Sequence, residues 1–232
     1  MILCINTTTA QFGVTLMETD GRILADFFIS PGSRHFSHFM PTLDYLFTVS
    51  QTNIAEIEAL MVATGPGSFT GLRVGLSVAK GFCHGLNIPI IGVSSLEAMA
   101  NQIAHIDHPL CPLIDSKRDE VFAALFQRHR IHGLVRLKED TCLRIGDLPS
   151  FVEGPAFFLG NDFNRQGAMV REAIGSQALL APPVLWNLKA STVGAVGLKR
   201  FHEHDFDDLR ELMPSYLRPP DIQPNPYPLL SE

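Results

Sequence analysis

The first hundred residues alternate strand-like and helix-like patterns of apolar positions. Residues 2–6 form a short apolar run that leads into three threonines, and two further strand-like runs cover residues 12–17 and 22–30. The dipeptide Asp20-Gly21 separates these two runs, and such a dipeptide favours a tight turn between antiparallel strands. We therefore expect the chain to open with a three-stranded antiparallel meander.

Helical periodicity begins soon after this meander. Apolar side chains recur there at three- and four-residue spacing, which places them on one face of a helix. They are Phe36, Phe39, Met40, Leu43, Leu46 and Phe47. Pro41 lies inside this pattern but near its start, where a missing N–H costs least. Buried strands are predicted at residues 57–64 and 88–93, the first followed by a helix over residues 70–86 and the second by a helix that starts at Ser94.

The resulting order is three strands and then helix, strand, helix, strand, helix, which predicts an α/β domain. Its first three strands would be antiparallel and its later strands parallel. This order is typical of a ribonuclease H-like half of an actin-type fold, although the string of elements also fits other α/β topologies.

The pattern changes near residue 105, where a polar stretch ends at Pro109. We predict an N-terminal ribonuclease H-like lobe over residues 1–104, a smaller C-terminal lobe over residues 105–218 and an extended proline-rich tail over residues 219–232. The second lobe repeats the layout of the first in reduced form, and its last helix is free to pack back on the first lobe. Its predicted strands cover residues 110–114, 121–126 and 156–160, and its predicted helices cover residues 164–174 and 188–201.

Composition and charge narrow the classes of function. Hydrophobic residues make up 46% of the chain and charged residues 18%, so most of it can fold around a core. The formal net charge of −6 repels nucleic-acid phosphates, so tight unaided binding of tRNA is not expected. The cysteines, which are Cys4, Cys83, Cys111 and Cys142, are far apart in apolar surroundings, which indicates buried free thiols. Without a signal-peptide pattern or a membrane-length apolar run, we expect a cytoplasmic protein that does not enter the membrane.

Residues 65–75 have the sequence G-P-G-S-F-T-G-L-R-V-G and join a buried strand to a helix. Glycines before a helix can leave backbone N–H groups free to hold an anion, so a phosphate- or nucleotide-binding loop is one hypothesis. Its residues would be Gly65, Gly67, Ser68 and Thr70. The lysine and the following hydroxyl residue of a P-loop are absent, and the spacing is not G-x-G-x-x-G. A nucleophile elbow at Ser68 is rejected because Pro66 stands where its first glycine would be.

Helix packing is a third hypothesis for the same segment. Gly67, Gly71, Gly75 and Ala79 recur every four residues and form a stripe along which another helix could approach closely. The remaining positions are largely apolar, so the helix must be covered on every side. The cover could be the helix around residues 36–47, another chain, or both; alternatively, everything is buried within the monomer. The pattern alone does not separate these hypotheses.

The string at residues 65–75 closely resembles the signature of the bacterial TsaB (YeaZ) family. The resemblance runs nearly from end to end; the other similar segments are residues 2–9, 35–47, 90–96 (IIGVSSL), 115–122 (DSKRDEVF) and 215–218 (SYLR). Three residues depart from the family pattern. Asn6 replaces the usual aspartate, Asp119 the usual glycine and Phe122 the usual tyrosine. The first departure weakens any independent nucleotide–metal chemistry.

The resemblance implies an actin-type (ASKHA), ribonuclease H-like α/β fold with two tandem lobes, the second reduced. It also implies a subunit without catalytic residues of its own, which supports threonylcarbamoylation of the tRNA adenosine beside the anticodon. Its partner would be the larger catalytic homologue TsaD, joined by the ATPase TsaE. A homodimer would form when TsaD is absent, and tRNA would be contacted only indirectly. The resemblance implies no cofactor, but it leaves open ATP or ADP at the partner interface.

In the family that this chain resembles, two apolar helices make the partner or dimer contact. The corresponding residues here are Phe36, Phe39, Met40, Leu43, Phe47, Gly67, Phe69, Gly71, Leu72, Arg73, Val74, Gly75, Val78 and Phe82.

An enzymatic function is the alternative, either an active actin-type ATPase or a glycoprotease-like metallopeptidase. The catalytic homologue uses an H-x-x-x-H pair with further ligands, whereas His35 and His38 are three residues apart and no third ligand is evident. We therefore expect no metal site. For Asp115, Arg118 and Glu120, a structural or partner-contact role is favoured over acid–base catalysis.

Overall fold

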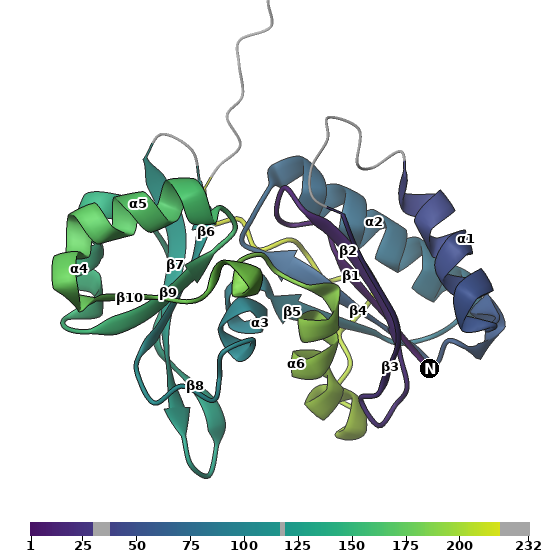
Figure 1. Ribbon diagram of the computed structural model, residues 1–232. Coiled ribbons are helices and arrows are strands. Elements are labelled where there is room, and N and C mark those ends of the chain that lie inside the picture. Colours follow the sequence, from purple (N-terminus) through teal and green to yellow (C-terminus); the bar gives the residue numbers. More distant parts are fainter. Residues whose placement is uncertain (30–37, 117–118, 219–232) are drawn as a thin grey trace, which may run out of the picture.

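The computed structural model describes residues 1–29, 38–116 and 119–218, which form two α/β lobes side by side (Figure 1). The sheet of the first lobe has the strand order β3-β2-β1-β4-β5. Its strands are β1 (Ile2–Asn6), β2 (Phe12–Met17), β3 (Ile23–Ile29), β4 (Ala59–Gly65) and β5 (Ile90–Ser94). The first three strands form the expected antiparallel meander, and β4 and β5 extend the sheet in parallel on the other side of β1.

Helices cover both faces of this first sheet. One face carries α1 (Phe39–Ser50) and α2 (Phe69–Leu86), and the other carries α6 (Ala190–His202) beside α3 (Ser95–Asn101). Side chains along a strand alternate between the two faces. Leu3 and Ile5 therefore join the core beneath α1 and α2, whereas Ile2 and Cys4 join the core beneath α3 and α6. Every residue of β1 is buried as a result.

The second lobe repeats the topology of the first. Its strand order is β10-β9-β6-β7-β8, with β6, β7 and β8 antiparallel and β9 and β10 parallel to β6. The strands are β6 (Leu110–Asp115), β7 (Glu120–His129), β8 (Gly133–Arg144), β9 (Ala156–Gly160) and β10 (Ala178–Leu180), and the helices are α4 (Leu148–Val152) and α5 (Phe163–Ile174). Short 3-10 turns at residues 54–56, 145–147, 175–177 and 183–185 connect the elements of the two lobes.

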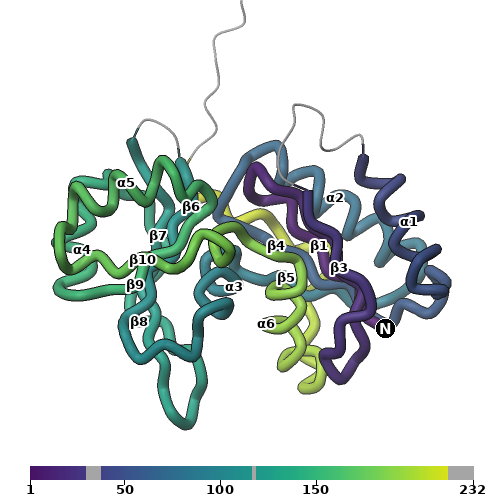
Figure 2. The backbone as a smooth tube through the Cα atoms, in the orientation of Figure 1, coloured from purple at the N-terminus to yellow at the C-terminus, as the bar shows by residue number. Residues whose placement is uncertain are grey.

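The last helix of each half packs across the junction between the lobes. α3 follows β5 but contacts β6 and β7, and α6 follows the second lobe but contacts β1, β2 and β4. Figure 2 shows the backbone passing through α3 and α6 between the two lobes. Leu96 and Met99 of α3, Val193 of α6 and Trp186 lie in one core that includes residues of both sheets. The two lobes therefore share this core, in addition to the separate core that each lobe has of its own.

Several elements differ from the sequence-based expectation. α1 begins at Phe39, and Phe36 lies outside the described residues, as does the predicted tail at residues 219–232. β8 was not predicted, because it is an edge strand whose charged residues interrupt the apolar alternation. α4 and β10 are too short to give a periodic signal. Among the described residues, no helix has both the length and the apolar character needed to cross a membrane.

The expected free thiols are present. Cys4, Cys83 and Cys111 are buried, whereas Cys142 is half-buried. Burial raises the pKa of the Cys83 thiol to about 12, and burial also raises the pKa of Cys4 and of Cys111. These three thiols are therefore protonated and unreactive at neutral pH.

α2 lies against the loop that follows β1. A Cβ atom added at Gly71 would overlap the carbonyl oxygen of Thr7, one at Gly75 would overlap the Thr7 hydroxyl, and one at Gly67 would overlap the carbonyl of Thr8. The Thr7 hydroxyl also donates a hydrogen bond to the Gly71 carbonyl oxygen at 2.7 Å. The stripe of small residues thus faces this chain's own first loop. The structure corrects its assignment to a partner groove.

We predict that Gly71→Ala strongly destabilises the protein, because its methyl group would overlap packed backbone. Overpacking of this kind costs about 3 kcal/mol or more when the backbone cannot move. Gly81, on the same helix, has open space at its Cβ position. Gly81→Ala should therefore raise the free energy of unfolding by roughly 0.5–1 kcal/mol, because alanine favours a helix more than glycine does. Urea unfolding of both variants measures the difference. Equal effects of the two substitutions would show that the stripe is not a close contact.

Candidate functional site

Part of the predicted partner surface is buried within the monomer. Its buried members are Phe39, Leu43, Gly71, Leu72 and Gly75. The Phe39 side chain is 3% exposed and packs on Phe12 with 5.1 Å between ring centroids. Leu72 is 1% exposed. These side chains hold α1 and α2 on the sheet, and the structure corrects their assignment to direct partner contact.

Of the remaining predicted residues, Phe36 lies outside the described ranges and Gly67 lies against the Thr8 carbonyl. The others form a strip along the outside of α1 and α2, which we call the outer strip. Its members are Met40, Phe47, Phe69, Arg73, Val74, Val78 and Phe82. Met40 is 57% exposed, Arg73 is exposed, and the others are half-buried. Ser77, Gly81 and Gly85 are exposed on the same helix at four-residue spacing. The sequence pattern predicts the inward stripe of small residues but not this outward set.

A groove of about 410 Å³ lies between α1 and the segment that follows it. It is lined by Met40, Leu43, Asp44, Phe47, Thr48, Thr52, Asn53, Ile54 and Phe82. Tyr45 and Val49, also on α1, are more than half exposed. Exposed apolar residues that adjoin a groove of mixed apolar and polar lining are typical of a surface that binds another protein.

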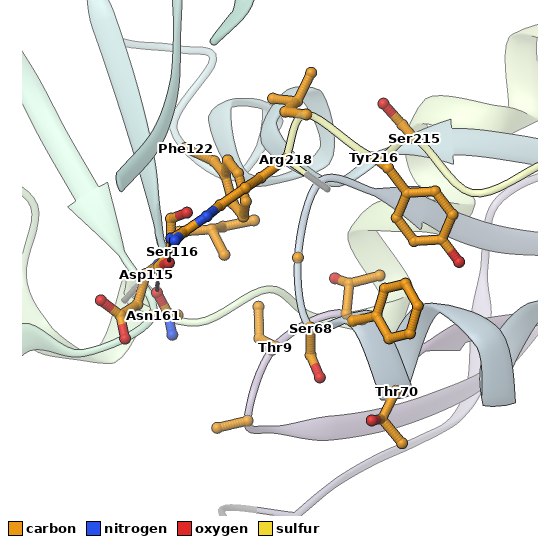
Figure 3. A pocket seen from close by; sticks show the side chains of 16 residues that line it. Thr9, Ser68, Thr70, Asp115, Ser116, Phe122, Asn161, Ser215, Tyr216 and Arg218 are labelled. Carbon is orange, nitrogen blue, oxygen red and sulfur yellow. Dashed lines mark hydrogen bonds between the residues drawn. The ribbon is translucent and has the colours of Figure 1, made fainter. Parts of the chain in front are cut away.

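A second hollow, a cleft of about 450 Å³, lies between the two lobes. Its lining comes from residues 8–10, 67–70, 114–116 and 215–218, together with Phe122 and Asn161. Figure 3 shows Asp115, Ser116 and Asn161 on one side of it and Thr9, Ser68 and Tyr216 on the other. The cleft therefore combines the first loop, the start of α2 and the C-terminal segment of the described chain.

The proposed phosphate-binding loop forms part of this cleft. The Ser68 N–H donates to the Thr8 carbonyl at 2.7 Å, and the Ser68 hydroxyl caps α2 by accepting the Gly71 N–H at 3.2 Å. Two of the backbone donors that a phosphate loop would offer are thus used within the protein. Gly65, with φ of +118°, precedes a cis peptide bond to Pro66. The Ser68 and Thr70 side chains are exposed at the start of α2.

Asn6 is fully buried where β1 ends. Its Nδ2 donates to the Leu188 carbonyl at 2.9 Å, and its Oδ1 accepts from the Thr8 N–H at 3.0 Å and from the Thr8 hydroxyl at 2.8 Å. The side-chain amide therefore ties the first loop to the segment before α6. An aspartate could not donate to Leu188, which gives a physical reason for the amide at this position.

The structure also shows the surroundings of Asp119 and Phe122, the other two residues that depart from the family pattern. Asp119 has φ of +61°, a left-handed conformation that glycine adopts without cost and aspartate tolerates better than most residues. An Asp119 carboxylate oxygen lies 3.7 Å from Arg165. Phe122 is buried at the cleft wall, where it contributes an apolar surface without the tyrosine hydroxyl.

The candidate acid–base residues are engaged in ion pairs. Both carboxylate oxygens of Asp115 accept from Arg165 Nη1, at 3.1 and 3.2 Å, and Glu120 accepts from Arg218 at 3.1 Å. Arg118 and His35 lie outside the described residues. Within the described ranges, no group of three or more His, Cys, Asp and Glu side chains is placed to hold a metal ion.

Known protein families and solved structures include relatives of this chain. A family model described as TsaD, tRNA N6-adenosine threonylcarbamoyltransferase, matches residues 23–155, which is more than half of the chain. The chain belongs to this family. It is also similar to the tRNA threonylcarbamoyladenosine biosynthesis protein TsaB of Bacillus subtilis, with 28% identity over 220 residues, covering 94% of this chain and 93% of the relative. The resemblance of the chain to the TsaB (YeaZ) family is thereby confirmed.

Solved structures confirm the fold. A Pseudomonas aeruginosa protein with similarity to the peptidase YEAZ superposes with a TM-score of 0.77 at 20% identity, covering 94% of this chain and 99% of its own. Component A of the Acidaminococcus fermentans (R)-2-hydroxyglutaryl-CoA dehydratase superposes with a TM-score of 0.50 at 9% identity, covering 87% and 98%. The predicted two-lobed, actin-type α/β fold is therefore present.

The sequence did not assign a role to the C-terminal segment at residues 215–218. This segment lines the cleft, and its Arg218 donates to the Ser116 carbonyl at 3.0 Å. Tyr216 packs on Phe69 with 5.2 Å between ring centroids. The only signal for these contacts was the similarity of S-Y-L-R to the family's closing motif, which gives no spatial information.

We predict that Asn6→Asp destabilises the protein by roughly 2–4 kcal/mol, because it buries a carboxylate against the Leu188 carbonyl and removes a donor. Asn53→Asp is the matched control. Asn53 is exposed and only accepts a hydrogen bond through its side chain, from the Ala55 N–H, and aspartate caps a helix as well as asparagine. Chemical denaturation should show a change of about 0.5 kcal/mol or less for the control. A stable Asn6→Asp variant would mean that the Leu188 contact is dispensable.

Proposed function

We propose that this protein is a non-catalytic subunit in the biosynthesis of tRNA threonylcarbamoyladenosine, which acts by binding a catalytic homologue of the TsaD type. The family model is described as the transferase, and the B. subtilis relative is named for this biosynthesis. The observation that carries the docking part of the proposal is the outer strip of α1 and α2. It is too apolar for a helix pair that has only solvent as its neighbour.

The shape of the outer strip supports a helical partner. Ser77, Gly81 and Gly85, which have small side chains or none, are exposed on α2, the helix that also carries the half-buried Val74 and Val78. Small residues at four-residue spacing let a second helix approach closely. The groove beside Phe47 and Phe82 offers a place for an apolar anchor of the partner. A four-helix contact across this strip is the arrangement that we infer.

The non-catalytic part of the proposal is supported by the cleft. Asn6 contributes no carboxylate, and all of its polar atoms serve the fold. Asp115 and Glu120 are each held by an arginine, which leaves them poorly placed as a general acid or base. The metal and the transfer chemistry would then belong to the partner.

The remaining parts of the assembly follow from the same surface. Without the catalytic homologue, a second copy of this chain would cover the outer strip as a homodimer. A TsaE-type ATPase would join the heterodimer, with ATP or ADP at the interface, and tRNA would be reached through the partner because the net charge is −6. The cytoplasm is the compartment in which such an assembly would work.

We predict that Val78→Asp abolishes binding to the catalytic homologue from the same genome, because a carboxylate would be buried in the apolar contact. Val184→Asp is the matched control, since Val184 is 74% exposed in the second lobe. Size-exclusion chromatography and calorimetry of each variant with the homologue measure the effect, and circular dichroism confirms the fold. Undiminished co-elution of Val78→Asp would refute the docking surface.

We also predict that the purified chain alone shows no metal-dependent turnover of ATP or peptide and no threonylcarbamoyl transfer. Mixing it with the TsaD and TsaE homologues, ATP, tRNA and a pre-formed activated threonylcarbamoyl donor should permit repeated rounds of transfer to tRNA. Radiolabel carried from the threonine part of that donor into tRNA is the readout. Turnover by this chain in isolation would favour the enzymatic alternative.

A further inference from the structure

One charged side chain on the outer strip is held in a fixed orientation. The guanidinium carbon of Arg73 lies 3.9 Å from the centroid of the Phe69 ring, and Arg73 Nε donates to the Tyr216 hydroxyl at 3.1 Å. Phe69 precedes Arg73 by one helical turn, whereas Tyr216 belongs to the C-terminal segment, 143 positions away. An aromatic face and a hydroxyl acceptor thus restrain a side chain that is otherwise costly to immobilise.

This restraint leaves the terminal Nη donors of Arg73 unused. A guanidinium carries five N–H groups, and only the one on Nε has a hydrogen-bond partner in the described part of the chain. Within the same ranges, no carboxylate forms an ion pair with Arg73, as is also true of Arg130, Arg144, Arg171 and Arg210, whereas the other described arginines each have one. Arg73 is exposed nonetheless. It offers a planar fork to a group outside this polypeptide.

The position of Arg73 indicates which kind of group it would meet. Phe69 and Tyr216 line the cleft between the lobes, but Arg73 does not. Arg73 contacts both of these aromatic residues from outside the lining of the cleft. Arg73 instead neighbours Val74 and Ser77 on the exposed side of α2, within the surface proposed for partner binding.

We propose that Arg73 determines partner specificity by binding a carboxylate of the docked protein in a two-pronged ion pair, and that Tyr216 is its positioning residue. A fixed guanidinium suits this role, because fork-to-carboxylate geometry gives direction as well as charge. Restraint in the free protein lowers the entropy lost on binding. The C-terminal segment thereby contributes to a surface that otherwise consists of α1 and α2. This inference rests on the proposed function.

The proposal is tested by the affinity of each variant for the TsaD homologue. Calorimetry measures this affinity without nucleotide, at several salt concentrations. Arg73→Gln should raise the Kd roughly 30-fold and flatten its salt dependence. Arg73→Lys keeps the charge but not the fork, so a loss of about tenfold is expected. Tyr216→Phe keeps the ring and removes only the hydroxyl, which should cost about fivefold through lost orientation.

A double-mutant cycle separates positioning from simple stabilisation. If Tyr216 acts through Arg73, Tyr216→Phe should change the Kd little in an Arg73→Gln background. Arg144→Gln is the matched control, because Arg144 is exposed on β8 and forms no ion pair in the described ranges. Thermal unfolding of each variant verifies that the fold is retained.

The outcomes distinguish this proposal from the one on which it rests. Wild-type chain that fails to bind the homologue overturns the proposed function and this inference with it. Wild-type binding that is lost in Val78→Asp but kept at full affinity in Arg73→Gln overturns the inference alone. An Arg73→Gln effect that appears only when ATP is added would assign the guanidinium to a phosphate, which also contradicts the proposed carboxylate.

Discussion

The close contact between α2 and the loop after β1 determines the form of the first lobe. Gly71 and Gly75 bring the helix backbone against Thr7, and no larger residue fits between them. Asn6, directly before that loop, holds it in shape from the other side. Because the helix is pressed inward along one stripe, its opposite side is turned fully outward. The outer strip is therefore a geometric consequence of how the inner stripe packs.

The same loop also helps to join the two lobes. Asn6 reaches the Leu188 carbonyl, Gln11 Nε2 donates to the Asn161 carbonyl at 3.2 Å, and the Ser95 hydroxyl donates to Thr8. These bonds connect the first loop to the segment before α6, to the end of β9 and to the start of α3. Together with the core shared by α3 and α6, they join the two lobes. The cleft therefore lies beside a junction where hydrogen bonds and a shared core connect the two lobes.

Much of the fold could be predicted from the sequence, and the misses have physical causes. The apolar runs that became β1, β2 and β9 have the predicted bounds, and the helix predicted over residues 70–86 begins only one residue earlier, at Phe69. Such elements are buried on at least one face, so their patterns are strong. β8 is an edge strand, and Arg136, Lys138 and Asp140 on it mask its period. Ser94 donates to Asp140 at 3.2 Å, and burial there raises the pKa of the Asp140 carboxyl.

The candidate site was predicted less completely than the fold. Residue spacing identified α2 as a helix that must pack against neighbours on every side. It could not show which side faces the sheet, because the helix has small residues along one side and valines along another. Membership in the family depended on a motif and not on periodicity. The contact of Tyr216 with Arg73 joins residues that are far apart in the chain, and only the folded arrangement brings them together.

The glycines of α2 have a consequence for how the helix is formed. Gly71, Gly75, Gly81 and Gly85 all lie within its eighteen residues, and each lowers intrinsic helicity by about 1 kcal/mol relative to alanine. A peptide of this sequence would therefore be largely unstructured in water, since even favourable sequences of this length are marginal. The surface that we propose for partner binding exists only as long as the sheet beneath it is intact. Local loosening of the first strand would remove that surface along with it.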